Sequence, residues 1–66
     1  MTIGERIKEL RNERGLTQIA FAEIFNIDKS TIAKYETNKN YPSIPMIIAM
    51  CKYFSVPSDY ILCLTD

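Results

Sequence analysis

Residues 15–38 read GLTQIAFAEIFNIDKSTIAKYETN, and this stretch decides the fold of the 66-residue chain. Apolar residues recur at helical spacing over residues 17–25 and again over residues 29–37. Asn26 tolerates the left-handed backbone that ends one helix, and Asp28 can cap the free N–H groups that open the next. The stretch therefore predicts two short helices joined by a tight turn.

The second of these helices offers a polar and mildly basic face. Its inner arc is predicted to hold Ile32, Tyr35 and Glu36. The residues that it leaves outside are Lys29, Ser30, Thr31 and Lys34. A helix-turn-helix unit is built in this way, with one helix bracing a second that presents its polar side chains.

Motifs in one register extend the pattern beyond the two helices. They are Leu16-Thr17-Gln18, Ala22-Glu23, Ser30-Thr31-Ile32, Tyr35-Glu36 and Tyr41-Pro42-Ser43. With these motifs the chain resembles the phage-repressor/Cro family of bacterial helix-turn-helix (XRE-like) DNA-binding proteins, from about residue 3 to residue 64. The resemblance implies an all-α, compact five-helix bundle of the lambda-repressor-like type. Its helix-turn-helix would lie at about residues 17–37, and two further helices at about 44–64.

The resemblance also implies a bacterial or phage transcriptional regulator that binds double-stranded DNA at an operator as a homodimeric repressor. Two reading helices would enter successive major grooves about 34 Å apart. The predicted base-reading residues are Lys29, Ser30, Thr31 and Lys34. Lysine donates to guanine O6 and N7, serine pairs with either kind of base edge, and the threonine methyl contacts thymine. Activation through a contact with polymerase stays open.

Residues on either side of the reading helix are expected to hold the DNA backbone. Gln18 lies in the first turn of its helix, where free N–H groups favour a phosphate. Lys39, Asn40 and the backbone amides nearby are predicted to clamp phosphates. The full predicted set of phosphate contacts is Thr17, Gln18, Asn38, Lys39, Asn40 and Tyr41. The resemblance further pairs Arg11 with Glu36 in a structural salt bridge, against the alternative of a solvated Arg11.

The first helix is predicted to begin after Thr2, with Glu5 reaching back to complete a capping box. Gly15 supplies a left-handed stop. Apart from Arg11, the charged face of this helix is expected to be solvated.

The last third of the chain predicts two helices. Ser43 is expected to cap a mostly buried helix that runs to Phe54, and Asp59 is expected to start a last short helix through Leu64. This final segment is more apolar than one exposed helix requires, so the excess indicates a subunit contact. The predicted dimer interface comprises Tyr60, Ile61, Leu62 and Leu64.

The charge balance alone argues mildly against nucleic-acid binding, because eight basic residues are matched by eight acidic ones. Their distribution changes this, since seven of the eight basic residues lie between Arg6 and Lys39. A dipolar molecule is expected, whose first two-thirds face phosphates. Without an apolar run long enough to span a bilayer, or a signal-peptide pattern, a single cytoplasmic domain at residues 1–66 is expected.

Composition argues against other classes of function. The chain has no His and no close Cys pair, so neither a metal site nor an enzyme is predicted, and no cofactor or small-molecule ligand is implied. Cys51 is expected to be a small buried thiol, whereas Cys63 is not placed. Two alternatives remain: a protein-interaction module of the same fold, and an antitoxin-like partner of a separate protein.

Overall fold

The computed structural model describes residues 1–64, and within them the chain forms five α-helices and no strand. The helices are α1 (Ile3–Glu13), α2 (Gln18–Ile24), α3 (Lys29–Glu36), α4 (Ile44–Phe54) and α5 (Ser58–Ile61). The predicted all-α, five-helix architecture is confirmed. None of the described helices combines the length and the apolar character needed to cross a membrane.

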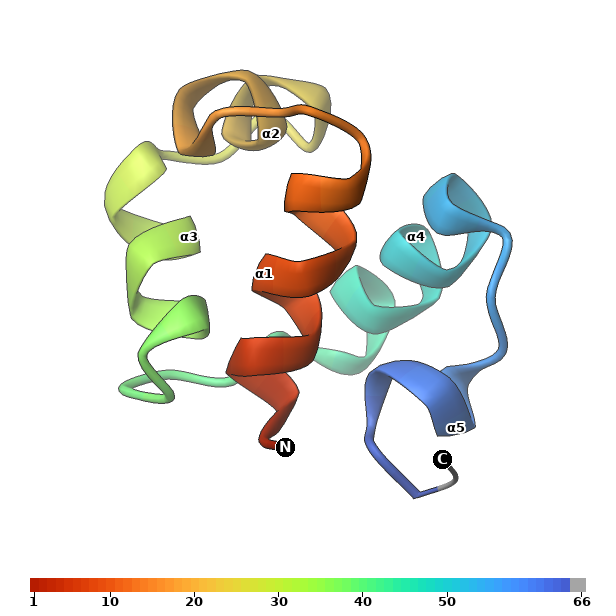
Figure 1. Ribbon diagram of the computed structural model, residues 1–66. Helices are drawn as coiled ribbons and strands as arrows, with labels where there is room; N and C mark the ends of the chain where they lie inside the picture. Colours follow the sequence, from red (N-terminus) through yellow and green to blue (C-terminus); the bar gives the residue numbers. More distant parts are fainter. Residues whose placement is uncertain (65–66) are drawn as a thin grey trace.

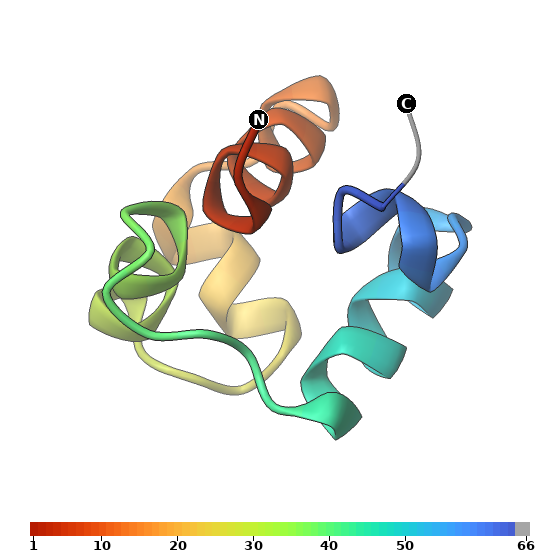
Figure 2. The ribbon, with the colours of Figure 1, turned by 90° about the horizontal axis from the view of Figure 1, so that it is seen from below.

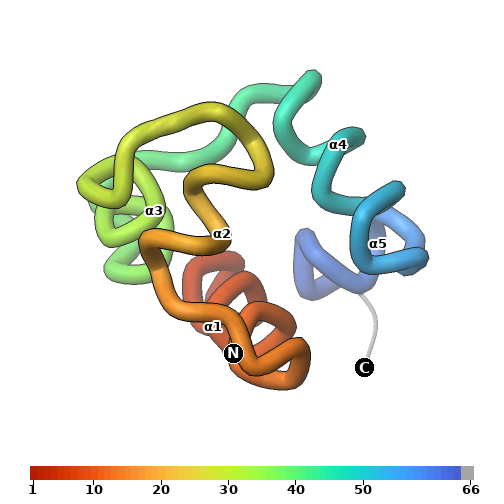
Figure 3. The backbone as a smooth tube through the Cα atoms, turned by 90° about the horizontal axis from the view of Figure 1, so that it is seen from above, coloured from red at the N-terminus to blue at the C-terminus, as the bar shows by residue number. Residues whose placement is uncertain are grey.

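In the view of Figure 1, helix α1 lies between α3 and the pair formed by α4 and α5. On one side α2 and α3 pack against each other, and α3 also contacts α1. On the other side α4 and α5 form a pair, of which α5 contacts α1. Seen from below (Figure 2) and from above (Figure 3), these two pairs lie on opposite sides of the molecule, with α1 along one edge.

Every helix contributes to one hydrophobic core. The largest fully buried side chains are Ile7, Phe21, Ile32, Met50 and Ile61, one from each helix in chain order. Burial of a side chain of this size stabilises a fold by roughly 1.5–3 kcal/mol. The expected place of Ile61 in a dimer interface is therefore wrong, because its side chain has no exposed surface left for a partner.

Side-chain caps are present at the beginning of three helices. The Thr2 hydroxyl accepts the backbone N–H of Glu5 at 3.1 Å, and the Thr2 backbone N–H donates to the Glu5 carboxylate at 2.8 Å. That backbone hydrogen bond is the main cause that lowers the pKa of Glu5. Thr17 and Ser43 cap α2 and α4 in the same manner. Asp28 does not, because it occupies the cap position of α3 without making a side-chain cap hydrogen bond.

All five described helices are followed within two residues by a residue with a left-handed backbone. These residues are Gly15, Asn26, Asn38, Ser55 and Cys63, with φ between 56° and 68°. Each of them lets the chain fold back so that a following N–H bonds a carbonyl of the last turn. The stops at Gly15, Asn26 and Asn38 follow from the residue type, whereas Ser55 and Cys63 give no such signal.

Two predictions for the last third of the chain are wrong. Helix α4 is amphipathic rather than mostly buried, since Ile44 is 73% exposed and Ile48 is 50% exposed. Helix α5 begins at Ser58 and ends at Ile61, short of the expected Leu64, because the left-handed backbone at Cys63 stops it. Both cysteines are free and half-buried, and Cys51 packs against the core.

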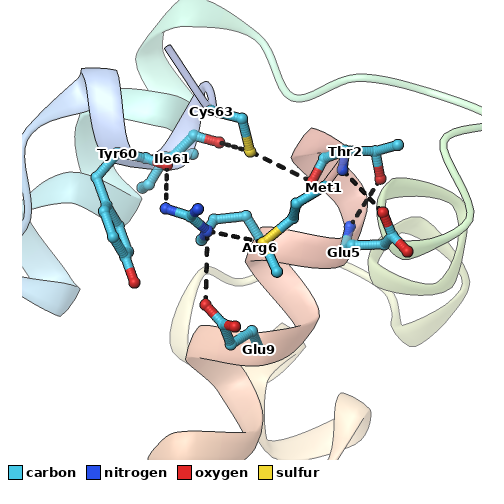
Figure 4. A network of polar contacts seen from close by, with 8 residues as sticks. All are labelled: Met1, Thr2, Glu5, Arg6, Glu9, Tyr60, Ile61 and Cys63. Carbon is cyan, nitrogen blue, oxygen red and sulfur yellow. Dashed lines mark hydrogen bonds and ion pairs between the residues drawn. The ribbon is translucent and has the colours of Figure 1, made fainter. Parts of the chain in front are cut away.

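The charged face of α1 is less solvated than predicted, because Arg6 is buried. Its guanidinium lies 3.8 Å from the centre of the Tyr60 ring and donates to the Tyr60 carbonyl at 2.8 Å (Figure 4). Its Nε also bonds the sulfur of Met1 at 3.0 Å and lies 3.5 Å from the Glu9 carboxylate. Arg6 thus ties α5 to the first half of α1.

Candidate nucleic-acid interface

Helix α3 presents a polar face made mostly of the predicted base-reading residues. Lys29, Ser30 and Lys34 are exposed, and Thr31 is half-buried at the side of this face. The opposite side of the helix is closed by Ile32, Tyr35 and Glu36, all of them buried. The structure therefore brings the four predicted residues onto one accessible part of the helix, with Thr31 the least available.

Sequence reasoning missed Ala33, which belongs to the same face. It is half-buried and follows Lys29 by four positions and Ser30 by three, so helical geometry places it one turn along from both. An alanine methyl group can contact the methyl group of thymine. The spacing itself was the available signal, but a small apolar side chain does not stand out among polar neighbours.

The inner side of α3 is fixed by the predicted ion pair. Arg11 Nε donates to one carboxylate oxygen of Glu36 at 2.6 Å, and Arg11 Nη2 donates to the other at 3.0 Å. Arg11 Nη1 donates to the Leu16 carbonyl at 2.7 Å. Arg11 and Glu36 are each only 8% exposed. This two-bond geometry joins α1 to the last residue of α3. Among the described residues, every buried side-chain N or O atom has a hydrogen-bond partner.

Gln18 takes part in the same network instead of pointing freely at solvent. Its side-chain Nε2 donates to Glu36 Oε1 at 3.0 Å, and the residue is half-buried. An amide has two N–H groups, so one remains for a phosphate. Glu36 therefore connects α1, α2 and α3 through a single carboxylate.

The predicted phosphate contacts after α3 are only partly available. The backbone N–H groups of Asn38, Lys39 and Asn40 all donate to carbonyls of α3, so the expected clamp of backbone amides is wrong. The Asn38 side chain is turned toward α1, where it bonds Gly4 and Thr2. The side chains of Lys39, Asn40 and Tyr41 remain exposed.

Thr17 lies at the opposite end of the helix-turn-helix unit. Its hydroxyl oxygen caps α2 by accepting the Ala20 N–H at 3.0 Å, and the residue is exposed. The hydroxyl hydrogen stays available as a donor because capping uses only the oxygen. Thr17 therefore combines a structural role with an accessible polar group.

Positive charge collects on α3 and the loop after it, although the whole chain is neutral. Lys29, Lys34 and Lys39 are all exposed there. The nearest acidic residues in sequence are Asp28 at the cap position and the buried Glu36, which Arg11 already neutralises. An exposed polar helix with three lysines around it has the chemistry to meet a polyanion.

A family model described as a helix-turn-helix matches residues 7–61, which include α2, the turn and α3. The chain belongs to this helix-turn-helix family. The resemblance to the phage-repressor/Cro type is confirmed, since a phage repressor is among its relatives. The matched residues end at Ile61, the last residue of α5.

Curated relatives of this helix-turn-helix chain have different regulatory roles. It is 42% identical over 50 residues to the immunity repressor protein of Bacillus phage phi105, covering 76% of this chain and 35% of that protein. It is 37% identical over 54 residues to the antitoxin PezA of Streptococcus pneumoniae serotype 4, covering 82% and 34%. It is 34% identical over 62 residues to the HTH-type transcriptional activator BcrR of Enterococcus faecalis, covering 94% and 30%. The chain therefore spans about a third of the length of these relatives.

Proposed function

We propose that this helix-turn-helix chain is a transcriptional regulator that binds double-stranded DNA in a sequence-specific manner, with α3 in the major groove. One observation carries the proposal. Helix α3 exposes Lys29, Ser30 and Lys34 while the Arg11–Glu36 pair holds its opposite side against α1. A recognition helix needs this combination, because base contacts require side chains that are free to reach out from a helix that does not move.

Readout of bases would come from the first two turns of α3. Lys29 and Lys34 would donate to guanine edges, and Ser30 would pair with either kind of base. Thr31 and Ala33 would supply methyl groups for thymine, with Thr31 limited by its partial burial. Each good base contact contributes about 1–3 kcal/mol of discrimination.

Phosphate contacts would come from the exposed side chains on both sides of α3. Lys39, Asn40 and Tyr41 follow the helix, and Thr17 opens α2. Gln18 would contribute through its second N–H. Such contacts position the protein on the duplex without reading its sequence.

The regulator would act as a homodimer that represses transcription by occupying an operator. Its relatives include a phage immunity repressor, which supports repression. The proposed subunit contact consists of Tyr60, Leu62 and Leu64, without the buried Ile61. Leu64 is 71% exposed and has the largest free apolar surface of the three, since the others are half-buried.

Charge reversal of the two lysines on α3 tests the proposal. Duplexes are first selected from a random pool at about 100 mM salt, and binding is then measured by fluorescence anisotropy over a salt series. Lys29→Glu with Lys34→Glu should abolish selective, salt-sensitive binding. The matched control is Lys8→Glu with Lys52→Glu, which makes the same change of charge at two exposed lysines on α1 and α4. Equal losses in both double variants, or none in either, would contradict a reading role for α3 and favour the protein-interaction module.

An antitoxin-like role is the second candidate, because PezA is among the relatives. In that case the chain would bind DNA and also a separate protein. Expression together with its neighbouring genes, followed by purification and mass spectrometry, distinguishes the two. A stoichiometric partner would favour the antitoxin-like role, whereas a homodimer alone would favour the simple repressor.

A further inference from the structure

We propose that Asn38 is a positioning residue, which sets the angle of α3 for DNA reading by bonding the first turn of α1. We name its two side-chain hydrogen bonds, to Gly4 and to Thr2, the Asn38 latch. This proposal rests on the proposed DNA binding, and it replaces the phosphate contact expected of Asn38 with an internal role. The latch is built from residues 34 and 36 positions apart in sequence.

The left-handed backbone at the end of α3 aims the Asn38 side chain at α1. Asn38 has a φ of 60°, and its N–H donates to the Tyr35 carbonyl at 3.1 Å. Its side-chain Oδ1 accepts the Gly4 backbone N–H at 3.0 Å, and its Nδ2 donates to the Thr2 hydroxyl at 2.9 Å. One amide thus uses a donor and an acceptor at once, and the residue is half-buried.

Both partners of the latch have a defined role in α1. The first four N–H groups of a helix have no partner within it, and the Asn38 oxygen satisfies the one at Gly4. The Thr2 hydroxyl that Asn38 bonds is also the cap of α1, where it accepts the Glu5 N–H at 3.1 Å. The end of α3 is therefore bonded to the beginning of α1 through the Gly4 N–H and the Thr2 hydroxyl, both of which belong to the N-terminal cap region of α1.

Close packing of the two backbones restricts the angle between α1 and α3 at this junction. A Cβ atom added at Gly4 would lie 2.3 Å from the Tyr35 carbonyl oxygen and 2.9 Å from that of Glu36. The Asn38 side-chain Oδ1 would lie 2.8 Å away, so the first turn of α1 meets the backbone of the last turn of α3 and the Asn38 latch itself. Opposite partial charges of the two helix ends favour the same contact.

A short helix fixed at one end has little tolerance for a change of tilt. Helix α3 has eight residues, and eight residues extend for about 12 Å. A tilt of about 10° at the latch would move its first turn by about 2 Å, more than a hydrogen bond to a base tolerates. Phosphate contacts by flexible lysines would survive such a shift. Loss of the latch should therefore reduce sequence discrimination and leave non-specific binding intact.

Two substitutions at residue 38 separate this role from a phosphate contact. Asn38→Gly keeps the left-handed backbone and removes both bonds, and the affinity for the selected duplex should fall about tenfold while the affinity for a scrambled duplex stays the same. Asn38→Asp should rescue the latch, because a carboxylate accepts the Gly4 N–H and the Thr2 hydroxyl can donate to its second oxygen. Its added negative charge should weaken binding to both duplexes equally, so the ratio of the two affinities stays within about twofold of the original.

The same variants are compared without DNA, at a temperature where circular dichroism gives full helix content. Residual dipolar couplings report the orientation of α3 relative to α1, and hydrogen exchange reports the Gly4 N–H. Asn38→Gly should change the couplings of α3 and speed Gly4 exchange about tenfold, whereas Asn38→Asp should restore both.

The outcomes distinguish the latch from the proposed function. An unchanged orientation of α3 in Asn38→Gly overturns the latch, and so does an altered orientation with an unchanged ratio of affinities. Equal losses on both duplexes in Asn38→Gly would make Asn38 a phosphate contact and also overturn it. If the original protein selects no duplex, the proposed function fails, and the couplings alone then support or overturn the latch as the device that orients α3.

Discussion

Gly4 is the residue at which the first turn of α1 meets the backbone of the last turn of α3. The nearest atom to an added Cβ would be a backbone oxygen at 2.3 Å, which cannot move aside as the end of a flexible side chain can. Gly4→Ala should therefore lower the free energy of unfolding by about 1–3 kcal/mol, as measured by urea denaturation. In an open helix the same change would raise stability by about 1 kcal/mol, so the sign of the effect is diagnostic.

Lys8→Ala is the matched control for this prediction, because Lys8 is exposed and lies one turn further along the same helix. Its effect should stay within about 0.5 kcal/mol. A Gly4→Ala variant as stable as the original would mean that α1 and α3 are free to separate at this end.

Single residues also mark the limit of prediction from sequence. The left-handed backbone of Asn38 followed from its residue type, but the direction of its side chain did not, since its partners Thr2 and Gly4 are distant in the chain. Arg6 looked like any charge on a solvated helix face, because its main partner is a backbone carbonyl 54 positions away. Patterns of residue type carry no information about which carbonyl or amide a fold brings nearby.

At the scale of elements, the buried ion pair decides how α3 is held. Arg11→Met or Glu36→Met alone leaves one charge buried without its counter-ion, which destabilises by about 3–5 kcal/mol. A domain of this size has a total stability of only about 3–10 kcal/mol, so each single variant should be largely unfolded or close to it. The double variant leaves no lone charge, and it should be more stable than either single variant in urea denaturation.

A pair of exposed charges on α1 provides the control for this double-mutant cycle. Lys8→Met and Glu13→Met change opposite charges on the same helix at exposed positions, and their effects should be small and additive. If the Arg11 and Glu36 variants were also additive, the two residues would contribute independently, and the pair would not explain how α3 is held.

Elements near the end of the chain were predicted least well, for a physical reason. Leu62, Cys63 and Leu64 continue the apolar character of α5, so the sequence extends the helix, whereas the left-handed Cys63 ends it. Helix α4 is apolar on more than one side, but a domain this small covers only one side of it. Helices α2 and α3 were predicted better because turn residues and apolar spacing agree there, although Asp28 makes no cap hydrogen bond.

At the scale of the whole molecule, one chain cannot read two successive major grooves. Its principal extents are 28 × 23 × 22 Å, whereas half-sites on one side of a duplex lie about 34 Å apart. The described chain also offers a single proposed recognition helix, α3, which has eight residues. Two copies side by side would match the spacing, which is the physical reason for the proposed homodimer.

The spacing of half-sites therefore tests the homodimer directly. An insertion of about 5 base pairs between two half-sites turns one of them to the opposite side of the duplex. A rigid dimer should then bind the altered site no more tightly than it binds a single half-site, whereas independent subunits would be insensitive to the insertion.

Leu64→Glu should abolish the gain in affinity from the second half-site without weakening binding to a single half-site, because it places a charge in the proposed contact. Ile48→Glu makes the same kind of change on α4, outside that contact, and sedimentation equilibrium gives the subunit state of both variants. Dissociation in Ile48→Glu but not in Leu64→Glu would move the subunit contact from the end of α5 to the exposed side of α4.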